Sequence, residues 1–284
     1  MGSYDNVFIG YQAASGSWSG DDSNNNVGVG YEAMAGAMQG STNNVAVGYE
    51  ALHDITTGGD NVAIGFRAGD TLSSADYNTL IGTGAGGALT DGGWNVMIGH
   101  NAGNLADTAT ASAEYNVYIG GSAGRYLDDG LQNVAIGYEA MKSTGATQNA
   151  NYNVAVGYQA LLSITDGDSN VAVGTASGDA IDTGYANTLM GRYAGSAITG
   201  GANNTCIGYA AGDSMTDNTN NVAIGSNALG VCESGGLNNV AVGVSAGAAL
   251  TTADGNVAVG YQASDAVTTG GYNTAMGYLA LSAE

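Results

Sequence analysis

The 284-residue chain contains no proline, two cysteines, two histidines and only four lysine and arginine residues together. The scarcity of basic residues argues against nucleic-acid partners, because proteins that bind phosphate backbones carry clustered lysine and arginine. The formal net charge is −21, so an anionic membrane surface would repel the chain. We therefore expect neither nucleic acid nor a membrane surface among its partners.

Other protein classes are excluded by patterns that the sequence does not show. No stretch is long and apolar enough to span a membrane, so we expect no membrane insertion. The 49 glycines do not recur at every third residue, which excludes collagen. Two cysteines do not make a disulfide framework. Hydrophobic residues make up 44% of the chain, which is not the profile of a disordered acidic protein.

What the sequence has in abundance is one motif, Asn-Val-Ala-Val-Gly-Tyr-x-Ala, repeated from end to end. Ten of the fifteen spacings between successive copies are 17 residues, and the others are 18, 20 or 21. Self-similarity at a fixed short period is the signature of a solenoid. We predict a single repeat domain over residues 1–284. Its coils begin at Asn6, Asn26, Asn44, Asn61, Asn78, Asn95, Asn116, Asn133, Asn153, Asn170, Asn187, Asn204, Asn221, Asn239, Asn256 and Asn273.

Each coil, numbered from its asparagine, has fixed residue preferences. Position 2 is Val or Thr, position 4 is Val, Ile or Met, position 5 is always Gly, and position 8 is Ala in fifteen copies. Alternating β-branched residues predict a short strand, with the side chains of positions 2 and 4 in the interior. A second extended piece over positions 8 to 12 would bring an aliphatic residue opposite, and the following residues favour a turn. The predicted fold class is all-β, a parallel β-solenoid.

The asparagine at position 1 is the candidate structural residue in all sixteen coils. Its amide both donates and accepts hydrogen bonds, so stacked copies are expected to form a ladder. The predicted interior is thin. A buried Val or Leu contributes roughly 1.5–3 kcal/mol, against about 1–2 kcal/mol of backbone entropy for each ordered residue. This small margin favours an oligomer, in which position 3 or the aromatic residue at position 6 would also be buried.

Tyrosine recurs at position 6 and is expected to form a broken column on the outside. Such a column could bind a glycan or a host receptor. Stacking along the solenoid, or packing between chains, explains it equally well. The column consists of Tyr11, Tyr31, Tyr49, Tyr138, Tyr158, Tyr209, Tyr261 and Tyr278.

Residues with catalytic chemistry occur only singly. Residues 82–87 match G-x-G-x-x-G, but they stand at positions 5 to 10 of one coil, and we interpret the match as a coincidence in a glycine-rich repeat. His53 and His100 have no recurring Ser or Cys partner. Cys206 and Cys232 occupy positions 3 and 12 of successive coils, so we expect no disulfide between them. We therefore expect no catalytic residue, no cofactor and no enzyme activity.

Two ligand hypotheses rest on weaker patterns. Calcium could be held by the aspartates of three turns, although solvated turns are the simpler explanation because turn chemistry favours Asp. Those aspartates are Asp21, Asp22, Asp128, Asp129, Asp166 and Asp168. A Thr and Ser column at position 13 is similar to the threonine columns of ice-binding solenoids, although such ladders are common in sheets. It comprises Thr56, Ser73, Thr90, Thr165, Thr199, Thr216, Thr251 and Thr268.

Two copies carry a family resemblance most clearly, Asn153-Val-Ala-Val-Gly-Tyr-Gln-Ala-Leu161 and Asn273-Thr-Ala-Met-Gly-Tyr-Leu-Ala-Leu281. The core motif resembles the head repeats of trimeric autotransporter adhesins of the YadA-like group. It is still more similar to the Asn-Thr-Ala-Ile-Gly-Tyr-x-Ala-Leu repeats of bacteriophage tail-fibre proteins. The resemblance covers essentially the whole chain. It implies a left-handed parallel β-roll, with three chains side by side in a fibre that meets a cell surface.

These observations lead to one functional hypothesis and two alternatives. The hypothesis is a non-catalytic structural or adhesive segment of a homotrimeric phage tail fibre that attaches to the host-cell surface. Its expected partners are further copies of the chain, side by side or end to end, and a cell-surface glycan or receptor. Its expected location is the virion tail fibre, or otherwise the extracellular space or the cell surface. The alternatives are a YadA-like bacterial adhesin head and a single-chain solenoid that binds ice or calcium.

Overall fold

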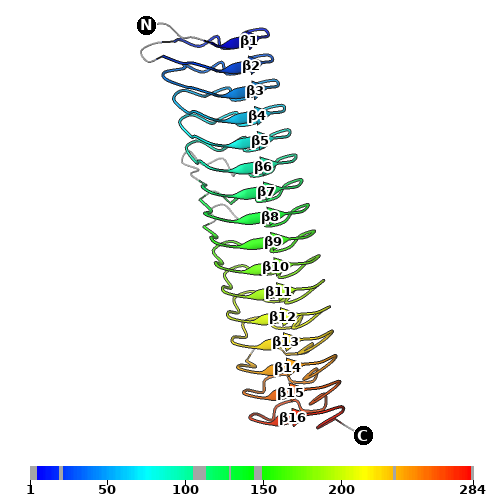
Figure 1. Cartoon of the computed structure of the whole chain (residues 1–284). Coiled ribbons are helices and arrows are strands. Elements are labelled where there is room, and N and C mark those ends of the chain that lie inside the picture. Colours follow the sequence, from blue (N-terminus) through cyan, green and yellow to red (C-terminus); the bar gives the residue numbers. More distant parts are fainter. Residues whose placement is uncertain are drawn as a thin grey trace. The chain divides into compact units, whose positions relative to one another are not determined.

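The computed structural model of the chain describes residues 5–18, 22–104, 113–127, 129–143, 149–232 and 235–282. These residues form sixteen parallel strands (Figure 1). Each strand has three residues and begins directly after the asparagine of its coil. The described residues contain no helix, and so none long and apolar enough to cross a bilayer. The predicted all-β parallel β-solenoid is therefore confirmed.

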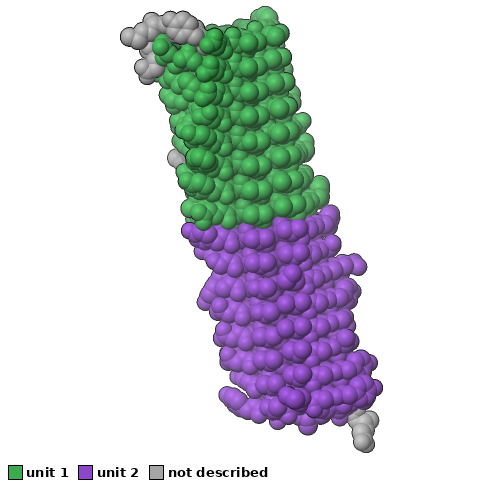
Figure 2. Space-filling model, viewed as in Figure 1, with its two compact units in different colours: residues 1–139, 145–149 green, residues 140–144, 150–284 purple. Residues whose placement is uncertain are grey.

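The chain comprises two compact units (Figure 2). Unit 1 consists of Met1–Glu139 and Gly145–Asn149, and unit 2 consists of Ala140–Thr144 and Ala150–Glu284. Unit 1 contains the strands β1 (Val7–Ile9), β2 (Val27–Val29), β3 (Val45–Val47), β4 (Val62–Ile64), β5 (Thr79–Ile81), β6 (Val96–Ile98), β7 (Val117–Ile119) and β8 (Val134–Ile136). Unit 2 contains β9 (Val154–Val156), β10 (Val171–Val173), β11 (Thr188–Met190), β12 (Thr205–Ile207), β13 (Val222–Ile224), β14 (Val240–Val242), β15 (Val257–Val259) and β16 (Thr274–Met276).

Within each unit, every strand pairs with the strand of the next coil in the same register. Ala172 at position 3 of β10 lies opposite Leu189 at position 3 of β11, and the other pairs match in the same way. Equivalent positions of successive coils therefore form straight columns. The insertions that lengthen some spacings do not disturb this register, because they lie outside the strands.

Our sequence-based prediction of which strand face is buried was wrong. In β2 to β15 the middle residue, position 3, is buried, and the residues at positions 2 and 4 are partly or well exposed. Val47 and Ile64, for example, are 37% and 40% exposed. The coil is narrow, and its interior holds the alanine that is most common at position 3. Two β-branched side chains from the same strand would overfill this space.

The limited interior volume is shared between positions 3 and 9 of each coil. Where position 3 is large and fully buried, as at Tyr118, position 9 is glycine, and a Cβ on Gly124 would lie 2.4 Å from the Tyr118 ring. Where position 9 is large, position 3 is alanine or glycine, as in the pair of Leu161 and Ala155. Both members of each pair face the same interior, so their combined size is limited. Other pairs with one large member are Ala46 and Leu52, Leu80 and Gly86, Met97 and Gly103, Leu189 and Gly195, and Ala223 and Leu229.

The expected second extended piece is instead a series of tight turns. In the described coils, positions 7 and 9 have positive φ angles, as at Ala176 (49°) and Gly178 (59°). The Ala176 N–H donates to the carbonyl oxygen of Tyr158 in the previous coil at 2.9 Å, and the Gly178 N–H donates to that of Ala194 in the next coil at 3.0 Å. The backbone is therefore bonded to both neighbouring coils without forming a strand. Beyond these turns the aliphatic side chains of position 12 are buried, as predicted, at Ile55, Leu72, Leu89, Leu127, Ile164, Ile181, Ile198, Met215 and Leu250.

The glycine at position 5 is required by the close stacking of the coils. Gly191 has a φ of +138°, and a Cβ there would lie 2.3 Å from the carbonyl oxygen of Gly208 in the next coil. The same approach recurs along both units. Any side chain at this position would force the coils apart, which explains why all sixteen copies have glycine.

Candidate functional site

The asparagines at position 1 lie in register along each unit. The Asn187 backbone N–H donates to Oδ1 of Asn170 at 3.0 Å, and Nδ2 of Asn187 donates to the same oxygen at 3.0 Å. Nδ2 also donates to the carbonyl oxygen of Gly201, in the turn of its own coil, at 2.8 Å. The same three contacts recur in other coils of both units. Each asparagine therefore binds the previous coil and also closes its own.

The tyrosines at position 6 form a continuous stack in the first part of unit 1. The ring centroids of Tyr11, Tyr31, Tyr49 and Phe66 follow one another at 5.4, 4.9 and 5.1 Å, with the planes within 16° of parallel. Such rings cover one another's faces, so within the stack only their edges remain accessible. A ligand that packs on an aromatic face would therefore bind at an end of the stack rather than along it.

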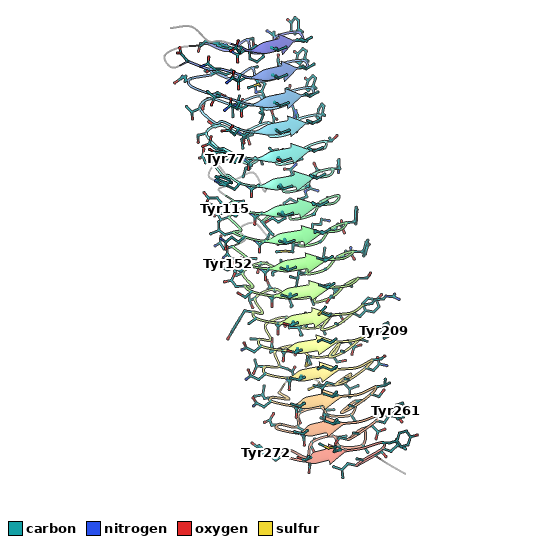
Figure 3. The ribbon with its side chains drawn as sticks, in the orientation of Figure 1. Tyr77, Tyr115, Tyr152, Tyr209, Tyr261 and Tyr272 are labelled. Atoms are coloured by element: carbon teal, nitrogen blue, oxygen red, sulfur yellow. The ribbon has the colours of Figure 1, made fainter. Side chains whose placement is uncertain are left out.

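In unit 2 the tyrosines at position 6 are brought together only in part. Tyr261 and Tyr278 stack with centroids 5.4 Å apart, whereas Tyr209 lies edge-on to Tyr193, which stands at position 7 of the previous coil, with centroids 6.3 Å apart. Figure 3 shows Tyr209 and Tyr261 on the same side of the unit. The remaining members of the predicted column, Tyr138 in unit 1 and Tyr158 in unit 2, are exposed. Position 6 thus provides several short aromatic surfaces.

A second aromatic column lies at the start of the strands, and sequence reasoning missed it. Tyr77, Trp94 and Tyr115 stack in unit 1 with centroids 4.1 and 6.2 Å apart, and Figure 3 shows Tyr77 and Tyr115 on this side. The same position holds Tyr152 and Tyr272 in unit 2. The signal was present, because an aromatic residue directly precedes the asparagine in five copies. These residues adopt φ near +60°, which is uncommon for aromatic side chains.

The outer sheet face of each unit, formed by positions 2 and 4 of the strands, is uncharged and mostly apolar. Every copy has Val, Ile, Met or Thr at these positions, and none has a charged residue. Ile136 and Met190 are 39% and 43% exposed. Parallel sheets are usually covered on both faces, and contiguous apolar surface of this kind marks sites of association.

A cluster of charged side chains adjoins the end of the aromatic stack in unit 1. The Nε of Arg67 lies 2.5 Å from Oε2 of Glu50 and 3.8 Å from Oδ2 of Asp70. Desolvation acts to raise the pKa of Glu50, but hydrogen bonds from Arg67 and Tyr49 bring it below its usual value. Burial raises the pKa of Asp70. One guanidinium thus serves two carboxylates, and the cluster remains negative when both are ionised.

A hollow of about 260 Å³ opens beside this cluster. Part of its floor comes from the glycine-rich residues 82–87 that matched a nucleotide-binding pattern. Two of these glycines have structural reasons, since Gly82 is the stacking glycine and Gly86 is the small partner of Leu80. The others, Gly84 and Gly87, line the hollow. The full lining is Phe66, Arg67, Asp70, Thr83, Gly84, Gly87, Ala88, Asn101 and Asn104.

The remaining candidate side chains take part in local contacts. Cys206 and Cys232 are buried free thiols, and burial raises their pKa values to about 12 and about 11. Thiols with such raised pKa values are poor nucleophiles at neutral pH. The Nδ1 of His53 lies 2.6 Å from Oδ1 of Asp54. His100 contacts the neighbouring asparagine amide at 3.5 Å.

The turn aspartates bind the backbone of the preceding coil. Oδ1 of Asp168 accepts a hydrogen bond from the Asn151 N–H at 2.7 Å, and aspartates in three other turns make the same kind of contact. Within the described part of the chain, no three or more His, Cys, Asp or Glu side chains are grouped so as to hold a metal ion. Two members of the calcium hypothesis, Asp21 and Asp128, lie outside the described residues.

The hydroxyl groups at position 13 are also used between coils. Oγ1 of Thr56 donates to the carbonyl oxygen of Ser73 at 3.1 Å, and Oγ1 of Thr251 donates to that of Thr268 at 3.1 Å. These threonines therefore form a ladder with the next coil. The hydroxyl donors of Thr56 and Thr251 are therefore engaged with the protein.

Comparison with known proteins adds no family assignment. A scan of the chain against models of protein families finds no match, and a search of curated proteins finds none either. The function is therefore argued from the residues and their geometry.

Proposed function

We propose that the chain is a non-catalytic structural and adhesive segment of a homotrimeric fibre. In this proposal three left-handed β-rolls lie side by side, with their outer sheet faces toward one another. The resemblance of the repeat to phage tail-fibre repeats supports a fibre on a phage tail, where it would contact the host-cell surface. The observation that carries the proposal is the outer sheet face, which is mostly apolar and has no charged residue in any copy.

The separation of charge from this face supports association. The chain carries a net charge of −21, yet positions 2 and 4 of all sixteen strands lack any charged residue. Burial of apolar surface contributes about 25 cal/mol per Å². Copies of this chain share one period, so the rows of side chains on one copy match the spacing of the rows on another. A second copy of the chain is therefore the partner that this face fits best.

The small interior supports association independently of the outer face. Positions 3 and 9 together hold one large side chain at most in each coil, and several coils have only Ala and Gly there, such as Ala172 with Gly178 and Ala241 with Gly247. A single chain thus buries little apolar surface for each ordered residue. Packing of the Val and Ile columns between chains would add a second buried layer.

The test is the absolute mass in solution, measured by light scattering after size exclusion. We expect about 84 kDa, three times the 28.0 kDa of one chain. The double substitution Val171→Glu and Val173→Glu places charges on the outer face and should dissociate the oligomer while the circular dichroism spectrum remains that of a β-protein. The control Val171→Thr should not, because position 2 is Thr in four copies. A monodisperse 28 kDa species for the unchanged chain would rule the trimer out.

A second candidate uses the same outer face in a single chain. A regular, flat face with Thr at some copies of position 2 is what a solenoid that binds ice would present. This candidate requires a monomer together with thermal hysteresis of freezing. A calcium-binding solenoid would instead show a melting temperature that falls on addition of EDTA. A YadA-like adhesin head shares the trimeric geometry and differs in requiring a membrane anchor downstream in the gene.

A further inference from the structure

The aromatic stack of unit 1 ends at Phe66, and the guanidinium carbon of Arg67 lies over this ring, 5.6 Å from its centroid. Phe66 packs on Tyr49 with centroids 5.1 Å apart, but the next residue in the position 6 column is Thr83, which has no ring. Phe66 is 49% exposed, and it lines the hollow. A half-exposed ring next to a cavity, with a guanidinium beside it, is a platform for a ligand that has both a flat apolar surface and polar groups.

The hollow lies where the coil that begins at Asn78 has glycine in place of larger side chains. Position 7 holds a long polar residue in several coils, such as Glu50 and Gln159, and a small one in others, such as Ala176, but only the coil that begins at Asn78 has glycine there, Gly84. Position 10 of the same coil is Gly87. The resulting volume of about 260 Å³ is slightly below the range of about 300–1,000 Å³ that holds drug-sized ligands. It is suited to one small ring.

Polar groups with unused hydrogen-bonding capacity surround the platform. Arg67 directs Nε to Glu50, and its two terminal nitrogens make no hydrogen bond to any described residue. Nδ2 of Asn104 donates to Oδ1 of Asn101 at 3.2 Å, which orients the two amides together. The Thr83 hydroxyl likewise has no partner among the described residues. The guanidinium offers adjacent donors in one plane, and each amide offers donors beside an acceptor oxygen, which together suit a pair of neighbouring hydroxyls.

The charge of the site selects among ligands that carry hydroxyl groups. Arg67 is already matched by Glu50 and Asp70, so the surroundings are negative, as is the whole chain. A phosphate or an acidic sugar would be repelled. A neutral hexopyranose meets every requirement, since its C–H face can pack on Phe66 while its hydroxyls reach the amides and the guanidinium. We propose that this hollow is a binding site for one neutral hexopyranose ring.

This site would specify the class of ligand that the adhesive segment binds. Its biological use rests on the proposed function, but the binding of a sugar does not. All of its residues belong to unit 1, and the contacts described above are made within one chain. Failure of the trimer would show in the mass measurement. Failure of the sugar site would show in a ligand measurement that does not depend on mass.

The test is saturation-transfer NMR of the full chain with methyl β-D-glucopyranoside and methyl β-D-galactopyranoside. We expect transfer to the ring protons on one face of at least one of these glycosides. Phe66→Thr should reduce the signal about fivefold or more, because it removes the platform, and position 6 already accepts Thr at Thr83. Phe66→Tyr keeps the ring and should retain the signal.

A matched pair of substitutions tests the hollow itself. Gly84→Gln should abolish binding by filling the space, and its φ of +64° is close to the +53° of Gln159 at the same position. Ser245→Gln makes the same addition at position 7 of a coil in unit 2, and it should leave binding unchanged. The proposal is overturned if neither glycoside receives saturation, if the signal survives in Gly84→Gln, or if methyl β-D-glucuronide binds better than the neutral glycosides.

Discussion

Asn187 shows how much a single side chain contributes in this fold. It is 1% exposed, and its amide nitrogen donates two hydrogen bonds. The bond to Asn170 joins two successive coils, and the bond to Gly201 closes its own coil. Its Oδ1 accepts from both the backbone and the side chain of Asn204. No other side chain of similar size has one acceptor and two donors in this arrangement. That requirement explains why position 1 is asparagine in every copy.

Replacing this asparagine should be costly. Asn187→Ala leaves buried donors on Asn204 and a buried carbonyl on Gly201 without partners, so we expect a loss of about 2 kcal/mol or more in the free energy of unfolding. Urea titration at constant protein concentration provides the measurement. The control is Asn203→Ala, which changes an exposed asparagine at a position that Ala186 already occupies with a φ of 55°. Equal losses for the two variants would contradict the ladder's role.

Asp179, at position 10 of its coil, has a buried carboxyl oxygen that destabilises the folded state when the group is ionised. Its Oδ1 is buried and has no hydrogen-bond partner among the described residues. Burial raises the pKa of Asp179, although a hydrogen bond from its own backbone N–H acts in the opposite direction. The fold thus favours the protonated carboxyl group. Its stabilising contribution is present at low pH, below the unfolded pKa of about 3.9, and is lost as the pH rises through the folded pKa.

Asp179→Asn should therefore raise the melting temperature at neutral pH. The gain should shrink as the pH is lowered through the acid range, because the wild-type carboxyl then becomes neutral as well. Thermal unfolding followed by circular dichroism from pH 7 to pH 3 measures it. Asp166→Asn removes the same charge from an exposed turn and provides the control. A gain that is independent of pH, or equal in both variants, would show that general charge repulsion rather than burial is responsible.

At the scale of the element, the coil is limited by its width. The backbone of each coil is set by glycine at position 5 and by left-handed residues at positions 7 and 9, and these bring the two sides of the coil close together. Only one large side chain fits between the strand and the turn of a coil, and it comes either from position 3 of the strand or from position 9 of the turn. Leu189 occupies the interior from the strand, and Leu161 does so from the turn two coils earlier. In the coil between them position 9 is Gly178, and a Cβ added there would lie 2.6 Å from the side chain of Leu189 and 3.1 Å from that of Leu161.

This shared interior predicts strong coupling between positions 3 and 9. Leu189→Ala should cost about 2–5 kcal/mol through the cavity it leaves. Gly195→Leu alone should cost about 1–3 kcal/mol, because its Cβ would lie 2.8 Å from Leu189. The double substitution reproduces the pairing of Ala155 with Leu161, so it should recover much of both losses. A double-mutant cycle in urea measures the coupling, and additive losses would disprove the shared volume.

At the scale of the whole molecule, charge is distributed very unevenly. The chain has 25 acidic residues against four basic ones, yet the outer sheet face has none of either. The acidic side chains are therefore concentrated in the turns, where they repel one another across neighbouring coils. Self-repulsion of this kind weakens the compact state and is reduced by salt.

Sodium chloride should therefore stabilise the protein. We expect the melting temperature to rise between low salt and about 0.5 M, where the screening length falls from tens of ångströms to a few. Chloride is preferable to sulfate, because sulfate strengthens apolar burial whatever the charge. If the outer faces associate, the oligomer should also persist at high salt, since that surface contains no ion pairs. A melting temperature that falls with sodium chloride would contradict this account.

The sequence by itself determined the period, the number of coils and the place of each strand. These features depend on local chemistry that recurs in every copy, namely the asparagine, the glycine four residues later and the β-branched residues between them. Each strand of the structure begins where that pattern puts it. The buried aliphatic residue at position 12 followed from the same reasoning.

Only the tertiary structure decided which strand face lies inside and which side chains meet. Both faces are apolar, with Ala or Leu between Val and Ile, so alternation alone cannot distinguish them. The width of the coil does, because it accepts Ala172 beside Gly178 but would not accept two β-branched side chains. The stacked rings and the hollow beside Phe66 depend on residues 17 positions apart, and on side chains that one coil lacks. Such neighbours are defined only when the coils are stacked.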